Sequence, residues 1–112
     1  MSSPDQRPRT EVPDGIKTDL LASERRCHIL RVLAASGGEA SVTDIAVRTR
    51  ARETSQSADQ IPPDAVDSVR YEIYERHLPK LTVTGIVEYD STLDTVRLTD
   101  SDACRETTHM LE

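Results

Sequence analysis

Apolar residues recur at helical spacing in the stretch that begins at Ser23. The Ser23 hydroxyl can cap free backbone amides, and the pair Gly37 and Gly38 is typical of a helix end. We therefore expect a first helix from residue 23 to about Ala35. Its predicted buried side comprises Cys27, Ile29, Leu30, Leu33 and Ala34.

A second helix is predicted from Ser41 to about Arg52. Ser41 and Asp44 resemble a capping box with a shortened acidic partner. The apolar positions form a narrow stripe of Val42, Ile45 and Ala46. Polar residues follow over 53–63 and end in two prolines, which predicts a long loop inside the domain.

The third helix is expected over residues 64–78, with Pro79 either ending it or opening a further turn. Its apolar positions cover an arc of roughly 200°, which is too wide for one buried side. We expect one half, made of Tyr71, Tyr74, Leu78 and Leu81, to pack on the first two helices. The other half then needs a cover from the long loop or from a second subunit. This predicts a homodimer whose interface contains Val66, Val69, Arg70 and Ile73.

Arg70 lies inside this apolar arc. Its guanidinium either extends past Ile73 and Tyr74 to solvent or reaches a carboxylate across a subunit boundary. The sequence leaves both alternatives open.

Residues 86–90 and 95–99 alternate in character and are joined by a turn-rich link, which predicts a β-hairpin. Three helices and a hairpin make a mainly α protein of the α+β class, arranged as a winged helix-turn-helix with a three-helix core plus a wing. The proline-containing residues 1–15 are expected to be a disordered arm, 16–99 the domain, and 100–112 a tail with at most a short helix.

The composition restricts the function classes. The chain has 112 residues, 36% of them apolar, with no Phe or Trp, so one small domain is the most it can bury. A net charge of -6 excludes a strongly basic nucleic-acid binder. Only Lys17 and Lys80 are lysines among 14 basic residues, a bias typical of halophilic proteins, in which acidity reflects the salt rather than the partner.

No apolar run approaches the length of a membrane span, and no secretory signal is recognisable, so we expect a cytoplasmic protein. Cys27 and Cys104 lack a CxxC partner and are expected to be reduced thiols. No Gly-rich phosphate loop and no nucleophile–base motif occurs, and His77 is expected simply to pack. The sequence predicts no enzyme, no cofactor and no metal site.

Two blocks resemble known regulators. Leu20-Leu-Ala-Ser-Glu-Arg-Arg-Cys-His-Ile-Leu-Arg-Val-Leu resembles the first helix of arsenical-repressor-type (ArsR-like) regulators. His77-Leu-Pro-Lys-Leu-Thr-Val-Thr-Gly-Ile-Val-Glu-Tyr-Asp resembles the end of their recognition helix and their wing. Over about residues 18–99 the chain is similar to small haloarchaeal winged-helix proteins of uncertain function. The resemblance implies a third helix in the major groove of double-stranded DNA and a wing on its backbone or minor groove.

The candidate DNA contacts are arginines and one lysine, because guanidinium forks suit phosphates and guanine edges. They are Arg48, Arg50 and Arg52 on the second helix, Arg76 and Lys80 near the third, and Arg97 on the wing. The alternative for each is a carboxylate-paired surface, such as Arg48 with Asp44 or Arg76 with Glu72. We therefore carry two hypotheses, a DNA-binding or transcription-associated regulator and a protein–protein interaction or dimerisation module that does not bind DNA.

Overall fold

In the computed structural model, which describes residues 22–109, the first helix begins at the Ser23 cap. The Ser23 hydroxyl accepts a hydrogen bond from the Arg26 amide (3.2 Å) and opens α2 (Glu24–Ala35). Beyond the helix end, Gly37 and Gly38 adopt φ of 78° and 92°, which favours glycine. The start and end that the sequence predicts are confirmed. The expected arm 1–15 lies outside the described residues.

The buried side of α2 agrees with the expected stripe only in part. Ile29, Leu30 and Leu33 are buried as predicted, but Cys27 is half-buried, Ala34 is exposed and Val32 is only 3% exposed. The reason is that α2 packs against β1 (Glu39–Ser41) and β3 (Thr95–Leu98) as well as against α3 (Val42–Thr54). The sheet thus covers a side of α2 that a three-helix core alone would leave open.

The second helix, α3, begins at the predicted cap and runs past the predicted end. The Ser41 hydroxyl accepts from the Asp44 amide (3.1 Å), and Val42, Ile45 and Ala46 are fully buried. The helix ends where Ser55 adopts a left-handed backbone, so the segment expected to be a loop from 53 begins later. That segment also holds a short 3-10 turn, η2 (Ala58–Gln60). Pro63 belongs to the next helix rather than to the loop, because a first-turn proline lacks only an amide the helix does not use.

The third helix is one rod with a wide turn in its middle. It comprises α4 (Pro63–Glu72), a π-helical turn η3 (Ile73–His77) and α5 (Leu78–Val83). Of the two outcomes expected at Pro79, the further turn is the one that forms. Proline has no amide hydrogen and its ring clashes with the preceding helical turn. The wider turn, closed by the Leu78 amide on the Ile73 carbonyl, accommodates Pro79 without ending the rod.

The π turn also corrects the predicted burial of this helix. Val69, Ile73 and Leu81 are each 1% exposed, whereas Tyr71 is 66% exposed. An extra residue in one turn rotates the following residues, so Leu78 and Leu81 return to the same side as Val69 and Ile73. One side of the rod therefore suffices, and the expectation that Val69 and Ile73 need a second subunit as cover is wrong. Val66 packs partly against the same core.

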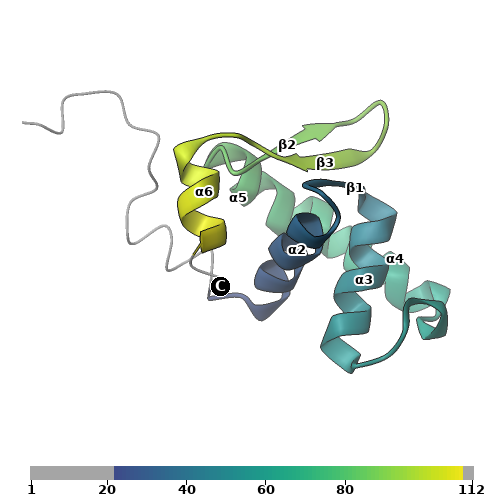
Figure 1. Ribbon diagram of the computed structural model, residues 1–112. Coiled ribbons are helices and arrows are strands. Elements are labelled where there is room, and N and C mark those ends of the chain that lie inside the picture. The colour runs from purple at the N-terminus through teal and green to yellow at the C-terminus, as the bar shows by residue number, and fades with distance from the viewer. Residues whose placement is uncertain (1–21, 110–112) are drawn as a thin grey trace, which may run out of the picture.

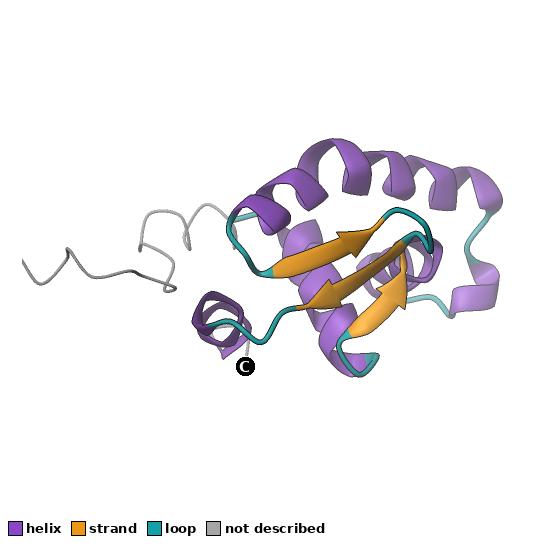
Figure 2. Ribbon diagram, turned by 90° about the horizontal axis from the view of Figure 1, so that it is seen from above, coloured by secondary structure: helices purple, strands orange, loops and turns teal. Residues whose placement is uncertain are grey.

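Three strands form an antiparallel sheet in the order β1-β3-β2, with β2 spanning Val87–Asp90 (Figures 1 and 2). The hairpin of β2 and β3 is confirmed. The strand β1 is not predicted, because three residues are too short to show alternation. Val87 and Val96 are buried under the sheet, while Glu39, Glu88 and Arg97 share its outer face.

The segment after the hairpin is more than a tail. It forms α6 (Asp102–His109), which lies beside α2 and α5 in Figure 1 and places Cys104, 4% exposed, in the core. The sequence predicts at most a short helix in this segment, and the structure has one, with Cys104 packed against the core. None of the helices in the described part of the chain is long and apolar enough to cross a bilayer.

Replacing single side chains by alanine tests which side of the third helix is buried. Because Ile73 is buried and Tyr71 is exposed, Ile73→Ala should lower the free energy of unfolding by about 2–4 kcal/mol and Tyr71→Ala by less than about 0.5 kcal/mol. Urea unfolding at constant KCl measures both. A larger loss for Tyr71→Ala than for Ile73→Ala would contradict the phase described here.

Candidate nucleic-acid interface

The predicted DNA-contacting residues divide into groups according to what their side chains bind. Arg50 forms an ion pair with Glu53 (3.4 Å), a carboxylate that Arg25 also holds at 2.7 Å. On the hairpin, Arg97 is ion-paired with Glu88, its neighbour across the β2–β3 ladder. The charges of Arg50 and Arg97 are thus balanced within the chain.

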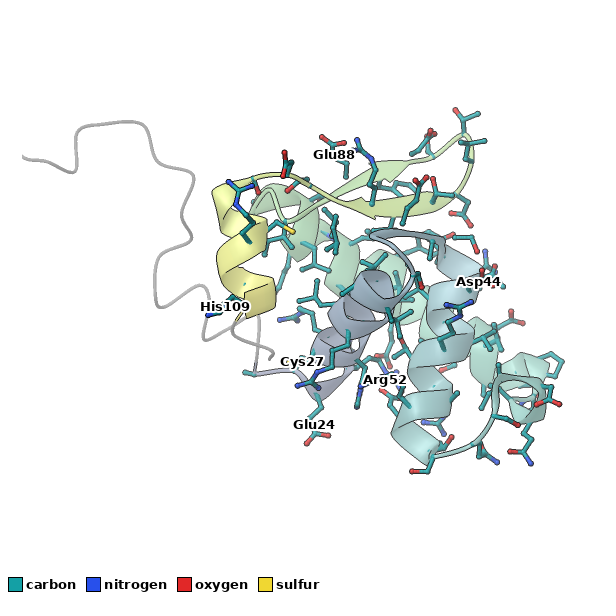
Figure 3. All side chains as sticks on the ribbon, in the orientation of Figure 1. Glu24, Cys27, Asp44, Arg52, Glu88 and His109 are labelled. Carbon is teal, nitrogen blue, oxygen red and sulfur yellow. The ribbon has the colours of Figure 1, made fainter. Side chains whose placement is uncertain are left out.

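Arg48 and Arg52 bind neutral partners on the neighbouring helix. The Arg48 guanidinium donates from NH1 to the Ser36 hydroxyl (2.9 Å), and Arg52 Nε donates to His28 Nδ1 (3.3 Å). Figure 3 labels Arg52 between α2 and α3. The ion pair of Arg48 with Asp44 that the sequence offered as an alternative does not form among the described residues, since the hydroxyl of Ser36 takes its place.

The exposed side of the third helix carries both signs of charge. Arg76 and Lys80 are exposed, and so are Asp64, Asp67 and Glu75. The alternative pairing of Arg76 with Glu72 is wrong, because Glu72 binds Arg25 at 2.8 Å instead. The carboxylates lie mainly in the first half of the helix and the cations in the second.

The outer face of the sheet is acidic and hollowed. A concavity of about 440 Å³ is lined there by Glu39, Glu88, Asp90 and Arg97 among others. Three carboxylates against one guanidinium make this side of the sheet unfavourable for phosphate groups. Arg97 is therefore not available there as an unpaired cation.

Arg70 reaches a carboxylate of its own chain, which is neither of the two alternatives left by the sequence. Its NH2 lies 3.7 Å from Asp94 Oδ2, and its guanidinium lies 5.7 Å from the centre of the Tyr74 ring. Tyr74 and Tyr89 each donate a hydroxyl to Asp94 Oδ1 at 2.6 Å. These two hydrogen bonds hold the pKa of Asp94 below its usual range. The bond from the Tyr89 hydroxyl to Asp94 also raises the pKa of Tyr89.

Asp94 sits where the hairpin turns and φ is 55°, a conformation that Asp and Asn tolerate better than most residues. Its carbonyl also accepts from the Val42 amide at the start of α3 (3.0 Å). One residue of the hairpin therefore fastens to the third helix through its side chain and to α3 through its backbone.

His77 is buried, as predicted, in the π turn. Arg26, itself only 6% exposed, donates from Nε to His77 Nδ1 (3.2 Å), and His77 Nε2 has no hydrogen-bond partner. Glu72 Oε1 lies 3.9 Å from that nitrogen. Burial first, and then the charge of Arg26, lowers the pKa of His77 to about 4. Nothing in the sequence pattern indicated the contact with Arg26.

The remaining candidate chemistry is sparse. Cys27 and Cys104 form no disulfide with a described residue, and burial raises the pKa of both thiols, so they are weak nucleophiles at neutral pH. Within residues 22–109 no three side chains of the His, Cys, Asp and Glu types gather in a way that could hold a metal ion.

Asp94 offers a stability test. Asp94→Asn keeps a residue that tolerates the turn conformation but removes the charge that two hydroxyls and Arg70 bind. We expect a loss of about 1–2 kcal/mol of unfolding free energy by urea denaturation. The control Glu88→Gln breaks an exposed ion pair and should cost less than about 1 kcal/mol. Equal losses in the two variants would contradict the special position of Asp94.

His77 predicts how stability depends on pH. The folded chain holds this imidazole neutral down to about pH 4, whereas the unfolded chain takes up the proton near pH 6.5. The unfolded state thus binds more protons in this window, so stability falls as the pH falls from 6.5 to 4, by at most about 3 kcal/mol. The variant His77→Gln should flatten this part of the curve, measured by urea unfolding at each pH. Unchanged pH dependence in His77→Gln would refute the assignment.

Comparison with known proteins places the chain by family rather than by activity. Residues 18–97 match a family model described as a domain of unknown function, DUF7344. A search of curated proteins and a search of solved structures found no match. The matched range contains α2 to β2 and nearly all of β3, which is the helical core and the sheet. Because the match covers more than half of the chain, the protein belongs to the DUF7344 family.

Proposed function

We propose that this chain is a winged helix-turn-helix domain that acts as a DNA-binding regulator of transcription. The observation that carries the proposal is the order of its elements: helix, short strand, two further helices and a hairpin, with the sheet in the order β1-β3-β2. This is the order of a winged helix-turn-helix, in which α3 and the third helix form the helix pair and β2–β3 the wing.

The surface supports a particular kind of DNA binding. A halophilic protein works at salt concentrations that weaken phosphate contacts, because the entropy gained by releasing counterions from the DNA falls as the salt concentration rises. Such a protein needs few, well-positioned cations together with base and shape contacts, rather than a broad basic surface. Several described arginines are already paired with carboxylates of the same chain, which fits that demand.

Duplex binding tests the proposal. Fluorescence anisotropy is measured from low to molar KCl with the DNA upstream of the protein's own coding sequence and with a scrambled duplex of equal length. We expect binding that weakens with KCl and is tighter for the native sequence, by tenfold or more as a rough guide. Absence of binding to either duplex at every salt concentration would refute the proposal.

A second candidate is favoured by the first half of the third helix. Asp64 and Asp67 are exposed there, and Tyr71 is 66% exposed beside them. A helix that enters the major groove would bring these carboxylates close to phosphates. The candidate is a winged-helix module that binds another protein. If neither duplex binds, recovery of a partner from native-host extract by the parent chain but not by Tyr71→Ala would support it.

A further inference from the structure

Most arginines whose contacts are described form ion pairs with carboxylates of the same chain. These pairs join Arg25 to Glu53 and Glu72, Arg50 to Glu53, Arg70 to Asp94, Arg97 to Glu88, and Arg105 to Asp100. A paired guanidinium must leave its carboxylate, or bring that negative charge along, before it can bind a phosphate. These arginines are therefore poor phosphate contacts.

Arg48 and Arg52 are different because their partners are uncharged. Arg48 binds the Ser36 hydroxyl at 2.9 Å, and Arg52 binds His28 Nδ1 at 3.3 Å. Neither forms an ion pair with another described residue, and both side chains are exposed. We call the surface made by His28, Ser36, Arg48 and Arg52 the α2–α3 arginine face.

We infer that the α2–α3 arginine face, and not the third helix, makes the phosphate contacts when this protein binds double-stranded DNA. The inference rests on the proposed function and states which surface of the domain binds the phosphate groups of the DNA. DNA is the occupant because the face offers positive charge and N–H donors. The third helix instead mixes Arg76 and Lys80 with exposed carboxylates at Asp64 and Asp67.

The two guanidinium groups are held in position before any ligand arrives. They extend from residues one helical turn apart, about 5–6 Å between Cβ atoms. Each is fixed by one hydrogen bond across the gap between α2 and α3, which lowers the conformational entropy lost on binding. A guanidinium has five N–H donors, so most donors of each remain for phosphate oxygens.

Two carboxylates border the face without neutralising it. Glu24 and Asp44 lie in the first turns of α2 and α3, where a negative charge complements the helix dipole. Figure 3 shows Glu24 at the far end of α2 and Asp44 at the start of α3, with Arg52 between the two helices. In Figure 1, α2 and α3 lie in front of the third helix.

The test compares the salt dependence of duplex binding in three double variants of the full chain. Arg48→Gln with Arg52→Gln removes two charges from the α2–α3 arginine face, and Arg76→Gln with Lys80→Gln removes two from the third helix. Arg48→Lys with Arg52→Lys keeps the charges. Anisotropy with the native upstream duplex gives the slope of log K against log[KCl], and circular dichroism confirms that each variant is folded.

We expect the first variant to reduce the slope by about 2, because each phosphate contact contributes about 0.9. The third-helix variant and the lysine variant should keep the parent slope. A reduced slope in the third-helix variant with a parent slope in the first would overturn the inference and leave the proposed function intact. Failure of the parent chain to bind any duplex would overturn both.

Discussion

The arrangement of this domain depends on the wide turn that precedes Pro79. A proline at this position would normally kink or end a helix. The π turn from Ile73 to His77 absorbs it, so that residues 63–83 form one rod with a single buried side. The same turn brings His77 to Arg26 and returns Leu81 to the core beside Ile73. Because Val69, Ile73 and Leu81 occupy the buried side of the rod, Tyr71 and the carboxylates near it lie on the exposed side.

The hairpin is fastened to that rod by polar contacts together with one edge-on contact between the rings of Tyr74 and Tyr89. The chain has no Phe or Trp, and the hairpin turn is held by Asp94 through Tyr74, Tyr89 and Arg70. A carboxylate that accepts hydrogen bonds from two hydroxyls and lies near a guanidinium has its negative charge stabilised by protein groups. A small core supplemented by such a cluster suits a composition poor in large apolar side chains.

The cations available for binding on this domain depend on which arginines are ion-paired, and less on the net charge. The net charge of -6 says little about which cations are available, because several of the described arginines already hold carboxylates. Two arginines on α3 are bound to a hydroxyl and an imidazole instead, and this difference separates them from their neighbour Arg50. Arg50 points to a different side of the same helix from Arg48 and Arg52, and of the three only Arg50 forms an ion pair with Glu53.

Local sequence determined the caps at Ser23 and Ser41, the apolar stripe of α3 and the hairpin, because each depends on residues within one or two turns of each other. Tertiary structure decided the rest. The strand β1, the place of Cys104 in the core, the partner of Arg70 and the burial of Val69 and Ile73 all depend on segments far apart in the chain. A fixed angle per residue describes a regular helix, and it could not anticipate a turn that contains an extra residue.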